Sequence, residues 1–244
     1  MSRDFTLIKY KELLTALDDY GQVTLRHDVD RKPKNSLATA YIERELGWKA
    51  TYYFRAVPQS FDEAVILQIA SLGHEIGYHY ESLATCHGNL EAAYDDFCRN
   101  LEKLRILVPV SAIVMHGSPT SKWDSRELWK HYDYHKLGID TESYLDTDFS
   151  EVFYLTDTGR RWDGYHVSIR DKIPEQQERW IQRGWCYHST DDVIQAVKEG
   201  SFPERVLVNT HPQRWTDSRL QWFSELALQS VKNLVKRCVR LRKT

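Results

Sequence analysis

The stretch VTLRHDVDRKP, residues 23–33, places a histidine and two aspartates directly after a short apolar run. A helix cap needs one such aspartate, and a turn needs one and usually a glycine. On a strand, Asp28 and Asp30 lie two residues apart and point to the same side. The pair therefore indicates a functional site where a buried strand ends. The alternative is that these aspartates cap the next helix or pair with Arg31 and Lys32.

Apolar runs and helical patterns alternate on both sides of this stretch. One helix is predicted before it, at about 7–20, and further helices alternate with strands after it. The predicted strands are 23–29, 50–57, 74–80 and 111–117, and the helices between them are 36–48, 60–73 and 89–107. Strand and helix in regular succession are typical of parallel βαβ units.

The second half of the chain is less regular but ends in the same pattern. Strands are predicted at 151–159 and 204–212, and helices at 125–138, 176–185 and 191–200. A long closing helix begins at about residue 218. No linker, repeat or low-complexity segment divides the chain. Residues 1–244 are therefore predicted to form one α/β domain, a distorted (β/α) barrel of about seven strands.

Composition argues against several classes of protein. The net charge is −2, so no overall basic field points to nucleic acid or to an anionic membrane. The four cysteines are scattered and form no CxxC motif, which argues against a zinc ribbon or a disulfide framework. No apolar run approaches the roughly 18 residues that span a bilayer, and the N-terminus lacks a signal-peptide core, so we expect a soluble cytoplasmic protein. We interpret the basic segment KRCVRLRKT, 236–244, as a solvated helix end that complements the helix dipole.

Polar side chains end five of the predicted strands. They are His27, Asp28, Asp30, Arg55, His79, Glu81, His116 and His211. In β/α barrels the C-terminal ends of separate strands meet at one face, where functional residues lie. Imidazole and carboxylate groups bind zinc or a similar divalent ion, which makes water nucleophilic near neutral pH. One aspartate of the pair can then ligate the metal while the other accepts a proton.

Three motifs resemble those of the polysaccharide deacetylase superfamily, the NodB-like carbohydrate esterases. HDVD, 27–30, resembles the paired-aspartate motif of that family, and GHEIGYHYESL, 73–83, resembles its metal-binding segment. NTHP, 209–212, resembles the late strand that carries a catalytic histidine. Order and spacing agree over about residues 20–215. The resemblance implies a distorted barrel and a hydrolase that uses a divalent metal, with Zn²⁺ expected, to remove an N-acetyl group from a sugar or glycan.

The same resemblance implies roles for four residues. Asp28 would be the general base, and His211 would be the general acid that protonates the leaving amine. Asp30 and His79 would ligate the metal. The N-acetylated sugar or glycan would then be the binding partner, with no nucleic acid and no membrane span involved.

The chain departs from the family pattern at two places. Leu83 stands where the family has a second histidine, and leucine cannot ligate a metal. His116, at the end of the next strand, is the first choice for the missing ligand. Glu81 is the alternative, because carboxylates also ligate zinc, and loss of the metal is a third interpretation. MHGSPTS, 115–121, replaces an arginine–proline motif. With these departures, the chain resembles a divergent branch of the family that is linked to surface-polysaccharide gene clusters.

Substrate-binding candidates come from two further places. Arg55 ends the second predicted strand. DTGRRWDG, 157–164, contains Asp157, Arg160 and Trp162. They resemble the place where deacetylases position an aspartate to orient a base and a tryptophan to wall the acetyl pocket. The alternative is a hairpin turn with a packed tryptophan.

Two other functions stay open at this point. One is a barrel that has lost catalysis and binds a glycan or nucleotide sugar. The other is an amidohydrolase acting on a small non-sugar amide. Metal content distinguishes the glycan-binding barrel from a deacetylase. A panel of amide substrates distinguishes the amidohydrolase from a deacetylase.

Overall fold

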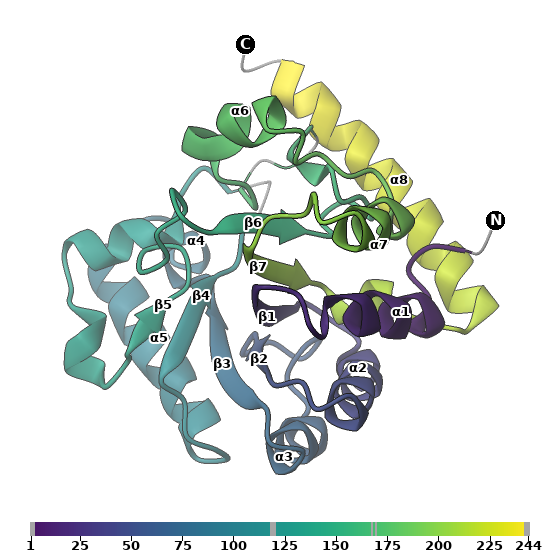
Figure 1. The fold of residues 1–244 in the computed structure, drawn as a ribbon. Helices are drawn as coiled ribbons and strands as arrows, with labels where there is room; N and C mark the ends of the chain where they lie inside the picture. Colours follow the sequence, from purple (N-terminus) through teal and green to yellow (C-terminus); the bar gives the residue numbers. More distant parts are fainter. Residues whose placement is uncertain (1–2, 118–120, 167, 169, 242–244) are drawn as a thin grey trace.

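Seven parallel strands form the centre of the structure (Figure 1). The computed structural model describes residues 3–117, 121–166, 168 and 170–241. The strands are β1 Gln22–Val29, β2 Ala50–Phe54, β3 Glu75–Tyr80, β4 Ala112–Met115, β5 Thr141–Glu142, β6 Phe153–Thr156 and β7 Arg205–Thr210. Their order in the sheet is β5-β4-β3-β2-β1-β7-β6, and every neighbouring pair is parallel. The sheet curls into an open barrel with β5 and β6 at its edges, so the predicted distorted (β/α) barrel of about seven strands is confirmed.

Eight α-helices accompany the sheet in the described residues. They are α1 Leu7–Leu17, α2 Pro33–Glu45, α3 Glu63–Ser71, α4 Ser82–Thr85, α5 Leu90–Arg105, α6 Pro174–Gln182, α7 Thr190–Lys198 and α8 Arg219–Leu241. Local sequence fixes where several of them begin. The side chains of Asp62 and Asn89 accept hydrogen bonds from backbone N–H groups three residues further on, as N-cap residues do.

The segment 125–138 is not the single helix that its pattern predicts. It forms two 3-10 helices, η1 Ser125–Lys130 and η2 Tyr134–Leu137. The carboxylates of Asp124 and Asp133 each accept a hydrogen bond from the backbone N–H two residues further on. Each aspartate therefore begins a new turn, and Gly138, with φ 67°, ends the second one. The two residues of β5, which follow, lie outside the predicted strands.

Buried polar side chains close the gap between the edge strands β5 and β6. Tyr144, just after β5, donates a hydrogen bond to Asp171 Oδ1 at 2.9 Å, and Tyr154 of β6 donates to the same oxygen. Arg26 of β1 donates to both tyrosine hydroxyl groups, at 3.1 and 3.0 Å. This network joins the two edge strands through side chains, where no backbone pairing between β5 and β6 is described.

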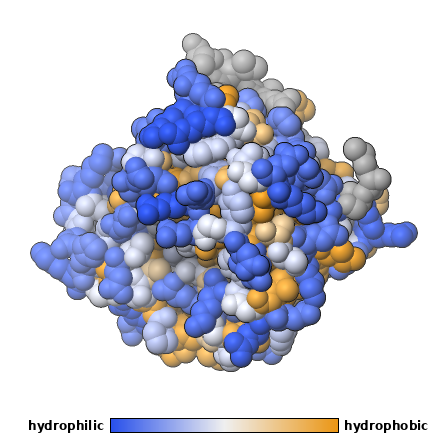
Figure 2. Space-filling view, viewed as in Figure 1, coloured by the Kyte–Doolittle hydropathy of each residue, from blue (hydrophilic) through white to orange (hydrophobic). Residues whose placement is uncertain are grey.

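The face of the molecule seen in Figure 2 is largely hydrophilic, with apolar side chains gathered toward its lower edge. Several exposed apolar residues lie on separate helices, among them Ile8 on α1, Tyr41 on α2 and Leu67 on α3. In contrast, α8 carries several on one helix, and it runs along the outer edge of the molecule (Figure 1). Among the described residues, no helix combines the length and the apolar content that crossing a membrane requires.

Candidate active site

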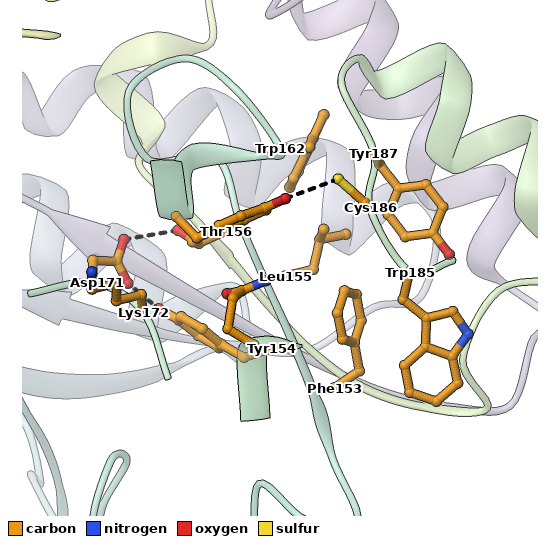
Figure 3. A pocket seen from close by; sticks show the side chains of 12 residues that line it. Phe153, Tyr154, Leu155, Thr156, Trp162, Asp171, Lys172, Trp185, Cys186 and Tyr187 are labelled. Carbon is orange, nitrogen blue, oxygen red and sulfur yellow. Dashed lines mark hydrogen bonds between the residues drawn. The ribbon is translucent and has the colours of Figure 1, made fainter. Parts of the chain in front are cut away.

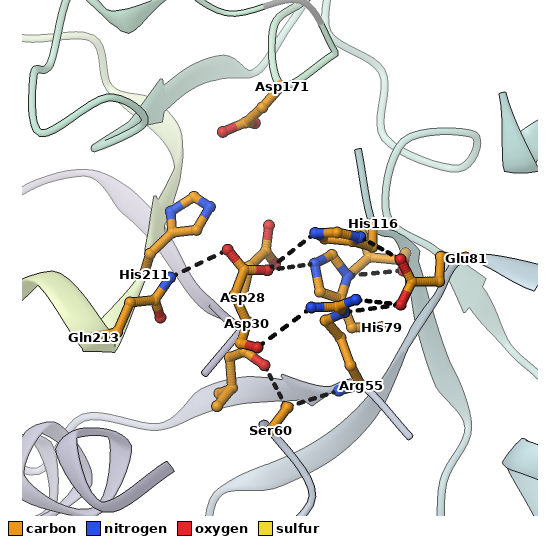
Figure 4. Close-up of polar contacts among 12 residues, drawn as sticks. Asp28, Asp30, Arg55, Ser60, His79, Glu81, His116, Asp171, His211 and Gln213 are labelled. Atoms are coloured by element: carbon orange, nitrogen blue, oxygen red, sulfur yellow. Dashed lines mark hydrogen bonds and ion pairs between the residues drawn. The ribbon is translucent and has the colours of Figure 1, made fainter. Parts of the chain in front are cut away.

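The C-terminal ends of the parallel strands bring three predicted metal ligands together (Figure 4). Asp30 follows β1, His79 lies in β3 and His116 follows β4. One potential ligand atom from each residue lies within 4.8 Å of the other two. Because His79 pairs with Val114 in the sheet, His116 is placed one strand away from His79 at the same edge. The structure thus brings together the residues that the sequence analysis preferred as ligands.

The hydrogen bonds of the two imidazole rings aim one nitrogen of each at Asp30. His79 Nδ1 lies 3.0 Å from the carbonyl oxygen of Val114, and His116 Nδ1 lies 2.8 Å from Glu81 Oε2. Both partners are hydrogen-bond acceptors, so each Nδ1 donates to its partner and each Nε2 faces Asp30. These Nε2 atoms lie 3.5 and 3.4 Å from Asp30 Oδ1.

This arrangement fits a divalent metal ion. Asp30 Oδ1 is buried and has no hydrogen-bond partner, whereas Oδ2 accepts from Gln213 at 3.1 Å. Ligand bonds of about 2.0–2.1 Å in a tetrahedral zinc site separate neighbouring ligand atoms by about 3.3–3.4 Å. The observed separations of 3.5 and 3.4 Å come close to that value. Two imidazoles and one carboxylate leave a fourth position for water or substrate, as in catalytic zinc sites.

The carboxyl group of Asp30 is in its charged form in this setting. Burial by itself would raise the pKa of Asp30. The neighbouring His79, His116 and His211 outweigh burial and hold that pKa well below its usual range. A deprotonated carboxylate is the form that ligates a metal.

Glu81, the alternative ligand, lies behind His116 and binds other groups. Its Oε2 accepts the hydrogen bond from His116, and its Oε1 accepts from the Arg55 guanidinium, with Nε at 3.0 Å. Burial would raise the pKa of Glu81, but His116 and Arg55 lower it to about 2. Glu81 therefore orients and polarises the His116 ring, as carboxylate partners of metal-bound histidines do.

Arg55, predicted to contact substrate, is committed largely to contacts within the protein. Besides binding Glu81, its Nη1 donates to the backbone oxygen of Asp30 at 3.4 Å. Its backbone N–H donates to Ser60 Oγ at 3.0 Å, and Ser60 in turn donates to the carbonyl oxygen of Val29. These contacts tie the ends of β1 and β2 to the carboxylate that holds His116.

Asp28 has one oxygen held in place and the other free. Oδ2 accepts hydrogen bonds from Asn209 at 2.9 Å and from Arg26 at 3.3 Å. Oδ1 is buried without a hydrogen-bond partner. In Figure 4, Asp28 lies beside Asp30, between His211 on one side and the two ligand histidines on the other. A fixed carboxylate with one unpaired oxygen beside the cluster can accept a proton there.

His211 is held by a buried aspartate. Its Nδ1 lies 2.7 Å from Asp157 Oδ1, and its backbone N–H donates to the same carboxylate. Arg214 and Trp215 also donate to Asp157, which is fully buried. Burial would raise the pKa of Asp157, but Arg214 and His211 lower it. Asp157, grouped with the substrate-binding candidates and expected by resemblance to orient a base, fixes the ring of His211 and leaves Nε2 available for proton transfer.

Arg160 and Trp162 lie in aromatic packing and not beside the three ligands. Trp162 stacks on Phe5 with 6.4 Å between ring centroids, and its Nε1 donates to Thr190 Oγ1 at 2.9 Å. The Arg160 guanidinium lies over the rings of Phe5 and Trp222, at 4.9 and 4.7 Å. These positions agree with the alternative interpretation of residues 157–164, a turn with a packed tryptophan.

Trp162 also lines a small pocket with Tyr165, Trp185 and Tyr187 (Figure 3). The pocket volume is about 20 Å³. That volume admits about one water molecule and excludes a sugar ring. This pocket is therefore no substrate site in the described conformation.

Arg26, Asn209 and Gln213 belong to the site although the sequence analysis did not single them out. Arg26 precedes Asp28 by two residues on the same strand, so the period of two could have placed their side chains on one side. Asn209 and Gln213 flank His211 by two residues on either side in the sequence. The same two-residue spacing, here from His211, could have indicated Asn209, which lies in β7.

Solved structures show which proteins have a similar fold. No family model and no curated protein matches the chain. A CE4 family pseudoenzyme from Bacillus anthracis has a TM-score of 0.48 and 13% sequence identity. The match covers 87% of this chain and 61% of that one, so this chain spans less than two thirds of its length.

Two further structures are similar over most of both chains. A family 4 carbohydrate esterase from Streptomyces lividans, in complex with acetate, has a TM-score of 0.45 at 15% identity and coverage of 87% and 90%. The peptidoglycan deacetylase PdaC from Bacillus subtilis has a TM-score of 0.42 at 11% identity and coverage of 92% and 98%. Each of the three structures matches with a TM-score below 0.5 and with at most 15% sequence identity.

Proposed function

We propose that this chain is a zinc-dependent hydrolase that removes an N-acetyl group from a sugar or glycan in surface-polysaccharide metabolism. The observation that carries the hydrolase part is the cluster of Asp30, His79 and His116, with Asp28 and His211 beside it (Figure 4). It combines three ligands for a divalent ion, one free carboxylate oxygen and one oriented imidazole. The choice of an N-acetylated sugar rests on the motifs HDVD, GHEIGYHYESL and NTHP.

Each residue of the site has a part in amide hydrolysis. A divalent ion bound by Asp30, His79 and His116 would polarise the acetyl carbonyl group and lower the pKa of water. Asp28 Oδ1 accepts the proton of the attacking water, since Asn209 and Arg26 fix the other oxygen.

The leaving amine takes a proton from His211. Asp157 holds His211 Nδ1 at 2.7 Å, so the proton to be donated is carried on Nε2. Base and acid thus come from β1 and from the end of β7, two neighbouring strands.

His116 takes the place of the second family histidine, at whose position this chain has Leu83. Leu83 is buried in α4 and belongs to the hydrophobic core. His116 comes from β4 instead, and Glu81 supplies the carboxylate partner that a metal-bound histidine needs. The change at Leu83 is therefore compatible with a complete set of three ligands.

Acetate release from N-acetylglucosamine oligomers tests this function with the zinc-loaded protein. We expect release by the wild type and release slowed by at least about 100-fold in D28N. Cleavage confined to small non-sugar amides would instead identify an amidohydrolase. Oligomer binding without acetate release would identify a barrel that binds glycans and does not hydrolyse them.

A further inference from the structure

The N-terminal end of α2 lies directly after the metal ligand Asp30 and carries no acidic group. Only Arg31 and Lys32 separate Asp30 from Pro33, the first residue of the helix. Lys32 occupies the N-cap position in a left-handed conformation, with φ 53°, and its side chain makes no capping hydrogen bond. The first turn contains no aspartate or glutamate. The first backbone N–H groups of a helix have no partner within it, and together with the helix dipole they favour an anion.

Cations gather at this end of α2 around the buried carboxylate of Glu225 in α8. Arg31 donates two hydrogen bonds to Glu225, at 2.7 and 2.6 Å, and Lys32 Nζ lies 3.8 Å from Glu225 Oε2. Lys232 lies seven residues after Glu225 in α8, so it is on the same side of that helix about two turns further on. Two neighbouring elements thus direct cations at one place.

Arg160 and Arg214 add two buried guanidinium groups to these cations. They are 8% and 6% exposed, and Arg160 Nε and Nη1 and Arg214 Nε have no hydrogen-bond partner in the described part of the chain. The aromatic rings beside Arg160 attract its charge but provide no oxygen atom for these N–H groups. Burial lowers the pKa of Arg160 and Arg214 lowers it further, while Glu225 raises it. These buried N–H groups are therefore available to attract an anion.

Positive charge exceeds negative charge in this group of residues, which we call the α2 cation cluster. Its members are Arg31, Lys32, Arg160, Arg214 and Lys232. The described carboxylates that act on Arg160 are Glu225, Asp157 and Asp4, so cations outnumber these carboxylates five to three. Asp30 is not counted, because its charge belongs to the proposed metal centre. The excess contrasts with the net charge of −2 of the whole chain.

Lys232 is the exposed member of the cluster without a paired acid. No described residue forms a hydrogen bond or an ion pair with its ammonium group. Burial of part of the side chain and the charge of Arg31 lower the pKa of Lys232, and the carboxylates of Glu225 and Asp30 offset this only in part. Because the charge of Asp30 acts on Lys232, the cluster lies beside the metal centre.

We propose that the α2 cation cluster binds a phosphate ester of the substrate, so that the acetylated molecule is an N-acetylated sugar phosphate. This inference rests on the proposed function, since it names the class of sugar whose acetyl group that site removes. Arg31 and Lys32, with side chains 27% and 35% exposed, and Lys232 contact the phosphate oxygens. A phosphate monoester has up to two negative charges and three free oxygens for these three cations, whereas a carboxylate has one charge and two oxygens.

Calorimetric binding of N-acetylglucosamine 1-phosphate and of N-acetylglucosamine to zinc-loaded D28N tests the cluster with turnover suppressed. We expect the phosphorylated sugar to bind at least about tenfold more tightly, with an advantage that decreases as salt rises. Adding K32Q/K232Q should remove most of this advantage, because two exposed cations are lost.

The matched control is K136Q/K198Q in the same D28N background. Lys136 and Lys198 are also exposed, but they lie shortly before β5 and β7 begin, and so at the opposite end of the barrel from the metal ligands. The control should keep the full advantage of the phosphorylated sugar. Circular dichroism checks that all variants are folded.

Equal affinity for the two sugars, or an advantage that K32Q/K232Q leaves unchanged, overturns the proposal. Tighter binding of the uronic acid form of N-acetylglucosamine than of the phosphate also overturns it, since the cluster would then bind a carboxylate. Failure of the proposed function is distinguishable from these results. Acetate release without a phosphate advantage refutes the cluster alone, and a phosphate advantage without acetate release by the wild type refutes the hydrolase alone.

Discussion

Replacing Glu81 with glutamine should weaken zinc binding without abolishing it. The carboxylate accepts a hydrogen bond from His116 Nδ1 at 2.8 Å, and it is itself held by Arg55. The glutamine side chain keeps the size and one acceptor but removes the charge that fixes and polarises the imidazole. Loss of such a partner typically reduces metal affinity about 10- to 100-fold, or about 1.4–2.7 kcal/mol.

A competition titration of Zn²⁺ against a chromophoric chelator measures this affinity directly. E75Q is a matched control. Glu75 begins β3, the strand that Glu81 follows, and it is exposed and binds Thr51 away from the cluster. It should bind zinc as the wild type does. Unchanged affinity in E81Q would refute the orienting role of Glu81. A loss as complete as that in His79→Ala would show that Glu81 is itself a ligand.

Three further substitutions test the groups around the metal ligands. D28N should retain zinc and lower the rate of acetate release by about 10²–10⁴-fold, because asparagine cannot accept the proton; an unchanged rate would identify a different base. R26M should lower the free energy of unfolding by about 3–5 kcal/mol, since buried Asp28 loses its cation; urea denaturation showing a change below about 1 kcal/mol would contradict this. The pKa of Asp171 is lowered from 3.8 to about 2. Burial alone would raise this pKa, but His211, Arg26 and hydroxyl donors outweigh burial. Its charge therefore stabilises the fold fully above about pH 4, and the advantage of the wild type over D171N should vanish as pH falls toward 2; a difference independent of pH over that range would refute the assignment.

The strands and their common edge could be predicted from sequence because each βαβ unit is local. Asp30, His79 and His116 each end an apolar run, and parallel strands place such ends at one edge. The two-residue strand β5 could not be predicted, because only pairing with β4 defines it. The segment 125–138 has helical periodicity, but two aspartate side chains divide it into separate turns.

The roles of individual polar groups depended on side-chain directions that the sequence does not contain. His116 and Glu81 both follow strands of the same sheet, and either could have completed the metal site. The hydrogen bond between them distinguishes ligand from supporting group. Asp157 was singled out, but its contact with His211 joins residues 54 positions apart in the chain. Only the packed structure shows that this aspartate is sealed from solvent.

The metal content of freshly purified protein tests the proposed centre most directly. Elemental analysis of the wild type, His79→Ala and His116→Ala, each checked for folding by circular dichroism, measures it. We expect about one zinc ion per chain in the wild type and a strong loss in both variants, because each removes one of three ligands. Full zinc content in His116→Ala, or no binding by the wild type even after incubation with zinc, would contradict a centre built from Asp30, His79 and His116.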